Sequence, residues 1–267
     1  MADYVHGYTE REAERLEDQA NAVRAFLLDD TAYRPGENVL EAGCGVGAQT
    51  TTLAGRNPDT AFFPVDISAP SLAKAASAVS VRDLRNVRFG RADLYRLPFL
   101  DGVFDHGFVC YVLEHLPDPV GGLAAVRRAV APGGTVTVIE GDHGSCYWHP
   151  STECSRRAWW CLVEVQGLMR GNALIGRELY PLLTSAGLRE VAVSPRMIYV
   201  DHSRPDLKDA FVRKTIIAMV EGVREEALER GLIDERSWRQ GIEDLNHVAD
   251  SPEGTFCYTF FKAIGTV

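Results

Sequence analysis

The chain has 267 residues, 46% of them hydrophobic, and a formal net charge of −9 at pH 7. This length is enough for one well-buried α/β domain with an elaboration, or for two small domains. An acidic surface repels phosphate backbones, so we expect no nucleic-acid partner.

Three further features bear on where the chain works. No run of about 18 apolar residues occurs, so no membrane span is predicted. Met1-Ala2-Asp3-Tyr4 lacks the basic and apolar regions that open a secretory signal. The six cysteines are scattered, which is typical of reduced thiols rather than of a disulfide framework. We therefore expect a cytoplasmic protein.

The first two thirds of the chain alternate between strand and helix patterns. A helix is predicted over residues 9–30, with Thr9 as its N-cap and Glu12 as the capping-box partner. Strands are then predicted at 37–41, 61–66, 87–90, 104–110 and 135–140, with helices at 49–54, 71–79 and 119–130 between them. This alternation predicts right-handed crossovers and a mostly parallel sheet with helices on both faces.

The pattern is weaker after Gly141. Helices are predicted at 155–169 and 177–186, a strand at 191–200, and two helices within 206–248 that join near Gly231. A last strand, 255–263, follows a long helical stretch, which suits an antiparallel strand inserted into the sheet. The fold class is therefore α/β, with seven strands and helical insertions.

A strand that runs into a glycine-rich turn is the most informative motif. Val39 and Leu40 end a buried strand, Glu41 follows them, and Gly43, Gly45 and Gly47 come next. Glycines let the backbone turn sharply and approach a ligand closely. At the carboxyl edge of an open α/β sheet this arrangement predicts a nucleotide site. The glycines alone do not identify the nucleotide, because they also fit a loose dinucleotide fingerprint.

Three acids help to identify the nucleotide. Glu41 could accept hydrogen bonds from an ammonium group, and it would repel a pyrophosphate. Asp66 ends the second strand, where an acid accepts from two ribose hydroxyls. Asp93 follows the third strand and can accept from an exocyclic amine such as that of adenine.

Together these motifs resemble the class I S-adenosylmethionine-dependent methyltransferases, in the broad group of ubiquinone/menaquinone and small-molecule methyltransferases. The resemblance covers residues 36–141 and rests on 39–47, 63–68, 91–94, 104–106, 112–116 and 131–134. It implies a Rossmann-like fold, S-adenosylmethionine as cofactor and S-adenosylhomocysteine as product. Pro64 departs from the family pattern, in which a glycine or small residue is more usual.

The resemblance also implies a role for each motif residue. Glu41 and the backbone of Gly43, Gly45 and Gly47 would hold the methionine end of the cofactor. Asp66, with Ile67 beside it, would bind the ribose, and Asp93 with Leu94 the adenine. Leu113 to His115 would line the pocket near the sulfonium, with Leu113 and His115 in contact, although His115 could equally cap the next helix.

Acid–base chemistry on the acceptor is predicted at the end of the fifth strand. Asp142 and His143 lie there, and an imidazole titrates near neutrality. By the resemblance, Tyr8 comes from an N-terminal segment, residues 1–35, that closes over the site. His143 could instead only bond its own loop, and Tyr8 could belong to a packed or disordered tail.

The acceptor is expected to be a small apolar or aromatic molecule, methylated by in-line displacement. The domain would span 36–267, with acceptor-lid elaborations at about 143–175 and 201–250 that carry Trp148, Trp159, Trp160 and Tyr199. The long N-terminal helix and the 206–248 helices could form the surface of a homodimer or higher homo-oligomer. The spacing of His143, Cys146, His149 and Cys154 is not a compact metal signature, so no metal is expected.

Two rival functions stay open. A Rossmann-type NAD(P)-dependent oxidoreductase would share the glycine turn and Asp66, and it predicts a nicotinamide-side pair such as Tyr-x-x-x-Lys. A catalytically silent cofactor-binding protein would keep the whole donor site without turnover.

Overall fold

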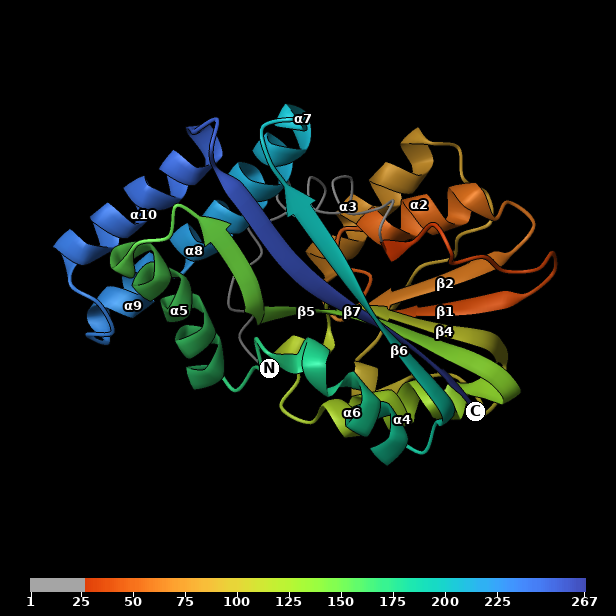
Figure 1. Cartoon of the computed structure of the whole chain (residues 1–267). Coiled ribbons are helices and arrows are strands. Elements are labelled where there is room, and N and C mark those ends of the chain that lie inside the picture. The colour runs from red at the N-terminus through yellow and green to blue at the C-terminus, as the bar shows by residue number, and fades with distance from the viewer. Residues whose placement is uncertain (1–26) are drawn as a thin grey trace.

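A seven-stranded sheet runs through the part of the chain that the computed structural model describes, residues 27–267 (Figure 1). The strands are β1 (Asn38–Ala42), β2 (Ala61–Asp66), β3 (Gly90–Arg91), β4 (Phe104–Cys110), β5 (Val130–His149), β6 (Arg189–Val200) and β7 (Thr255–Thr266). The helices are α2 (Ala48–Arg56), α3 (Ala69–Val81), α4 (Pro119–Ala129), α5 (Glu153–Leu168), α6 (Leu179–Ser185), α7 (Pro205–Leu207), α8 (Ala218–Gly222), α9 (Arg224–Glu229) and α10 (Glu235–Asp250). Short 3-10 turns are η1 (Leu94–Arg96), η2 (Leu113–His115) and η3 (Ile175–Glu178), and η4 (Lys208–Ile217) is π-helical.

The strand order is β3-β2-β1-β4-β5-β7-β6. β1 pairs in parallel with both β2 and β4, and β7 runs antiparallel between β5 and β6. This confirms the predicted fold class, including the antiparallel last strand. The order of the crossovers reverses between β1 and β4, and ligands bind beyond the carboxyl ends of strands at such a point.

Two hydrophobic cores flank the sheet because residues of a strand alternate between its faces. Val39 packs in one core with Leu53 of α2, and its neighbour Leu40 packs in the other with Leu123 of α4. Figure 1 shows α4 and α6 on the face opposite α2 and α3. Glu41 therefore lies on the α2 face, two residues beyond Val39.

Strand β5 is longer than the sequence indicates. A strand was expected over 135–140, but the ladder with β7 resumes at Cys146 after a register shift and continues to His149. The shift interrupts the two-residue period, so no continuous alternation marks this part of the strand. Trp148 stacks on Phe256 of β7 across the resumed ladder, with an interplanar angle of 10°.

The helices after β6 also differ in detail from the prediction. The expected junction lies at Gly231, whose φ is +66°. The first of the two expected helices is itself divided, because the chain passes through η4 and α8 and breaks again at Val223 before α9. The third strand, β3, has two residues where four were expected. The predicted helix over 9–30 lies almost wholly outside the described residues.

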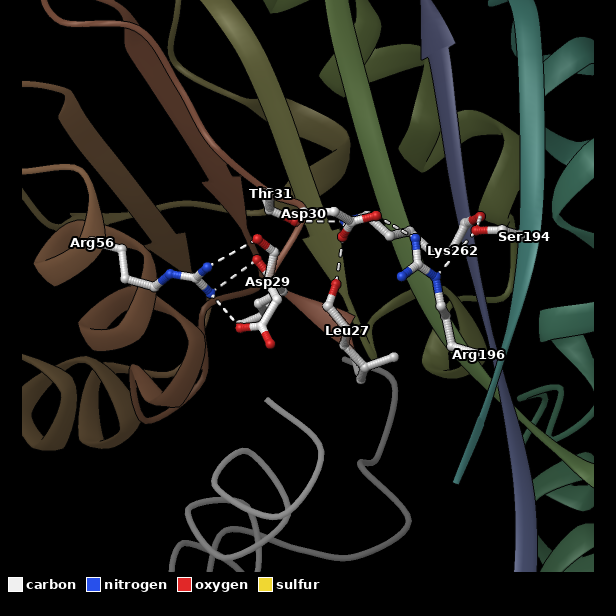
Figure 2. A network of polar contacts seen from close by, with 9 residues as sticks. Leu27, Asp29, Asp30, Thr31, Arg56, Ser194, Arg196 and Lys262 are labelled. Carbon is white, nitrogen blue, oxygen red and sulfur yellow. Dashed lines mark hydrogen bonds and ion pairs between the residues drawn. The ribbon is translucent and has the colours of Figure 1, made fainter. Parts of the chain in front are cut away.

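Residues 27–31 are tied to the last strand by a buried lysine (Figure 2). Lys262 of β7 donates to the Leu27 carbonyl at 3.2 Å, to Asp30 Oδ1 at 2.6 Å and to Thr31 Oγ1 at 2.6 Å. Its side chain is only 2% exposed. Burial lowers the pKa of Lys262, and the Asp30 carboxylate opposes that change. The start of the described chain is thus attached to β7, the strand next to the β6 edge of the sheet.

Two arginines extend this attachment to neighbouring elements. Arg56 at the end of α2 donates to the carbonyls of Leu28 and Asp29, each at 3.0 Å. Arg196 of β6 pairs with the second oxygen of Asp30. Figure 2 shows the two arginines approaching residues 27–31 from opposite sides. The segment therefore links α2, β6 and β7 on one face of the sheet.

Replacing the buried lysine tests how much this attachment stabilises the fold. Lys262→Met removes three donated hydrogen bonds, so we expect the free energy of unfolding to fall by about 2 kcal/mol in urea titrations. Lys74→Met is the matched control, because Lys74 is exposed on α3. Equal stability of the two variants would contradict this role of Lys262.

Candidate functional site

The glycine turn lies directly beyond β1. Gly43, Gly45 and Gly47 have φ of +78°, +53° and +80°, a region that disfavours residues with a Cβ. A Cβ on Gly43 would lie 2.4 Å from Val112 Cγ2, whereas one on Gly45 would meet nothing within 4 Å. The turn thus packs against the end of β4 at its first glycine and is open at its second, where a ligand can approach the backbone.

Asp66 joins the end of β2 to this turn. Its Oδ2 accepts the Gly45 N–H at 2.8 Å, and its Oδ1 accepts the Ser68 N–H at 2.8 Å. The Gly43 N–H bonds the Val65 carbonyl at 2.8 Å. These bonds fix the carboxylate beside the open glycine, with lone pairs left over for ligand hydroxyls.

Glu41 is buried between the turn and α2. Thr50 Oγ1 of α2 donates to Glu41 Oε2 at 2.7 Å. Burial raises the pKa of Glu41 to about 8, the Thr50 hydrogen bond opposes the shift, and the charge of Asp66 adds to it. A cation beside Glu41 would reverse this shift, because it favours the charged carboxylate. The site therefore fits a ligand that brings an ammonium group.

The predicted adenine side is more exposed. Asp93 Oδ1 accepts the Tyr95 N–H at 3.0 Å and so caps η1. Ile67 is 44% exposed just beyond β2, and its carbonyl accepts from Arg91 Nε at 3.0 Å. Leu94 is half-buried and packs against α4. An acid and two apolar side chains thus lie beside the ends of β2 and β3, as a purine site requires.

The turn after β4 is fixed by hydrogen bonds to an acid on β5 that the sequence analysis did not single out. Glu140 Oε1 accepts the N–H groups of Val112 at 2.9 Å and of Leu113 at 2.7 Å. Tyr111, which precedes them, has a φ of +57° that is unusual for an aromatic residue. Leu113 is buried, and His115 Nε2 lies 3.5 Å from Glu114 Oε1. The sequence feature that could have indicated Glu140 is its position. Like Glu41 and Asp66, it is an acid at the end of a predicted strand.

The two residues predicted for acid–base work have different surroundings. Asp142 accepts two hydrogen bonds from Arg177, at 2.8 Å each, and others from Gly144 and Ser145. With both oxygens engaged, Asp142 is better suited to positioning than to accepting a proton. His143 Nδ1 lies 2.5 Å from Tyr258 Oη, and Trp159 Nε1 donates to the His143 carbonyl at 2.8 Å.

Tyr258 is a second site residue that the sequence analysis did not single out. Burial raises its pKa well above the ordinary value, and the charge of Glu114 adds to the shift. Its ring lies 4.6 Å from that of Phe260, centroid to centroid. The sequence feature that could have indicated Tyr258 is the alternation of aromatic residues along β7. Tyr8 lies outside the described residues, so its role stays a prediction.

Residues 27–267 contain no group of three or more side chains suited to holding a metal ion. No helix within that range is both long enough and apolar enough to span a bilayer.

Comparison with known proteins identifies the domain. Residues 40–138 match the family described as "Methyltransferase domain". Residues 40–138 are a methyltransferase domain. This confirms the resemblance that Glu41, the glycine turn and Asp66 predicted, and the matched range contains every predicted donor-site residue.

Individual relatives are more distant. The chain is similar to an uncharacterized 37.1 kDa protein in transposon TN4556 of Streptomyces fradiae, 32% identical over 67% of this chain and 51% of that protein. It also resembles a demethylmenaquinone methyltransferase of Beutenbergia cavernae, 32% identical over 44% of this chain and 46% of the relative. The chain thus spans about half the length of these relatives. Phosphoethanolamine N-methyltransferase 2 of Haemonchus contortus, solved with S-adenosylhomocysteine, shares the fold with a TM-score of 0.55 at 18% identity, over 94% of this chain and 53% of that chain.

The raised pKa of Glu41 predicts a pH dependence of stability. The folded state favours the protonated carboxyl, so its stabilising effect is complete below the ordinary pKa of 4.5 and is lost as the pH rises toward 8. Between those limits wild type should lose about 3 kcal/mol of unfolding free energy relative to Glu41→Gln. Urea unfolding at pH 5 and pH 8.5 measures this. Glu153→Gln, at an exposed carboxyl, should show no such trend, and a pH-independent difference for Glu41→Gln would contradict the prediction.

Proposed function

We propose that the chain transfers a methyl group from S-adenosylmethionine to a small-molecule acceptor. The observation that carries this proposal is the joint placement of Asp66 and Glu41 around the open Gly45. One carboxylate fits ribose hydroxyls and the other fits the ammonium of a methionine group. The methyltransferase domain and the solved fold neighbour with S-adenosylhomocysteine support the same cofactor.

When bound, S-adenosylmethionine supplies an electrophilic methyl group. The residues of the chain then have to hold the acceptor in line with that methyl group and exclude water. Leu113 and Tyr258 are buried, and the half-buried ring of Tyr111 lies 5.7 Å from that of Phe260 on β7, centroid to centroid. These rings and side chains suit an apolar or aromatic acceptor.

His143 is proposed as the group that holds or removes a proton from the acceptor. Its contact with Tyr258 Oη fixes the ring orientation, and the neutral imidazole can accept a proton at one nitrogen only. Asp142 positions the strand that carries His143 through its pair with Arg177. The hydroxyl of Tyr8, from a segment proposed to close over the site, is a further candidate.

The oxidoreductase rival depends on Tyr-x-x-x-Lys, in which the two side chains act together. Tyr258 and Lys262 have this spacing, but they lie on strand β7 rather than on a helix. Four residues of a strand span about 13 Å, whereas i and i+4 are neighbours on a helix. Tyr258 contacts His143 and Lys262 contacts Asp30, so the pair does not form the reactive unit of that rival.

We also propose a cytoplasmic location and a domain that spans 36–267 behind the closing segment 1–35. All six cysteines lie within the described residues and none is in a disulfide, which supports a reducing compartment. A homo-oligomer and the lid role of residues 143–175 and 201–250 remain proposals for solution and mutational study.

Donor binding separates the proposed function from its first rival. Isothermal titration of the chain with S-adenosylmethionine and with NAD should give heat with the former only. Asp66→Asn should weaken S-adenosylmethionine about tenfold, because the amide loses charge at the ribose hydroxyls. Asp59→Asn, in an exposed turn, is the control. Binding of NAD alone would overturn the proposal.

Turnover separates the proposed methyl transfer from the alternative of a catalytically silent cofactor-binding protein. With an acceptor found by screening phenols, quinols and amines, His143→Gln should lower kcat about 100-fold and leave donor affinity unchanged. Tyr8→Phe tests the hydroxyl of the N-terminal tyrosine in the same assay. Unaltered kcat in His143→Gln would exclude His143 as the acid–base group, and the absence of transfer to every acceptor would favour the silent protein.

A further inference from the structure

A fully buried acid lies behind the turn that follows β4, with one of its oxygens unused. Glu140 Oε1 holds the N–H groups of Val112 and Leu113. Glu140 Oε2 is buried and has no hydrogen-bond partner among the described residues. A buried polar atom without a partner is destabilising, so it calls for an explanation. Holding the turn accounts for Oε1 but not for Oε2.

A second acid lies beside the first. Glu114, in η2, is also buried and accepts from Gln166 Nε2 at 3.0 Å. Burial and then the charge of Glu114 raise the pKa of Glu140 well above the ordinary value. Two neighbouring carboxylates in a dry environment repel each other unless a proton or a cation is placed between them.

No described basic side chain supplies that cation to Glu140. Besides burial and Glu114, the groups that act on Glu140 are backbone N–H groups of residues 112–114. Arg177 is paired with Asp142, and Lys262 with Asp30. The imidazole of His115 lies 3.5 Å from Glu114 Oε1, so it faces the other acid of the pair and not Glu140. Within residues 27–267, the hydroxyl of Tyr111 and Oε1 of Gln166 are likewise buried without a hydrogen-bond partner. The region around Glu114 therefore has unused oxygens on three side chains, which fits a positively charged ligand.

The acid pair adjoins the donor site through a single residue. Val112, whose N–H bonds Glu140, is the residue that a Cβ on Gly43 would strike at 2.4 Å. Leu113, the other residue held by Glu140, belongs to the turn that lines the sulfonium region by family resemblance. In the proposed complex the ammonium of the donor is assigned to Glu41, so the positive charge left for this turn is the sulfonium.

We propose that Glu140, together with Glu114, recognises the sulfonium charge and so distinguishes S-adenosylmethionine from the neutral S-adenosylhomocysteine. The inference rests on the proposed donor site. Both ligands carry the same adenine, ribose, ammonium and carboxylate, and they differ only in the methyl group and its charge. Attraction to a carboxylate acts on the donor and disappears after transfer, which favours release of the product. Glu140 is in this view a specificity-determining residue for the donor.

Dissociation constants of both ligands, measured by titration calorimetry on the whole chain without an acceptor, test the inference. Glu140→Gln keeps an oxygen to accept the N–H groups of Val112 and Leu113 but removes the charge. We expect it to weaken S-adenosylmethionine about tenfold relative to S-adenosylhomocysteine. Glu114→Gln should act in the same direction, and it replaces the first variant if that one does not fold. Glu153→Gln, an equal charge change at an exposed position, should leave the ratio of the two constants as in wild type.

The outcomes separate the inference from the function on which it rests. If both ligands bind wild type and the ratio is the same in Glu140→Gln, the sulfonium is not recognised by this acid and the inference is wrong. Equal weakening of both ligands would also overturn it, since that result assigns Glu140 only to holding the turn. If wild type binds neither ligand, the proposed donor site fails as well.

Discussion

The contact between Gly43 and Val112 brings the ends of β1 and β4 together. These neighbouring parallel strands flank the point where the crossovers reverse, and ligands bind beyond the carboxyl ends of strands at such a point. Absence of a Cβ at Gly43 lets Val112 approach, and Glu140 holds Val112 in place from the neighbouring strand. One connected edge of the sheet is therefore formed by the glycine turn, the turn after β4 and the part of β5 that carries Glu140. Asp66 and Glu41 are positioned along this edge.

Buried acids dominate the electrostatics of this edge. Glu41 and Glu140 both lie out of water, and burial raises the pKa of each. Neither has a described cation as its partner, whereas Asp142, equally buried, is neutralised by Arg177. Asp142 is therefore part of a structural ion pair, whereas Glu41 and Glu140 lack a counter-charge among the described residues. Such acids reduce the stability of the free protein and become favourable when a positively charged ligand binds.

Local signals were sufficient to predict the strand and the turn that carry the proposed donor site. The strand, the glycine turn and Asp66 could be predicted because each depends on residues close in sequence, and the two-residue and helical periods were intact as far as Glu140. Glu140 itself was not recognised as a site residue, because its role comes from N–H groups 28 and 27 residues away. The contact of His143 with Tyr258 joins residues 115 apart, and no local pattern indicates it. Beyond Asp142 the register shift interrupts the two-residue period, which is why no strand was predicted over the second half of β5.

The placement of β7 between β5 and β6 also has a consequence for biosynthesis. Among the described strands β6 pairs with β7 and with no other, and residues 27–31 are fastened through Lys262 to that same last strand. During translation β6 therefore emerges well before the segment that will cover its edge. For the time needed to synthesise residues 201–266, the nascent chain exposes the unpaired edges of both β5 and β6, a state prone to wrong pairing with other chains. The strand that carries Tyr258 is thus made after β6, whereas the glycine turn and the acids up to Glu140 are made before it.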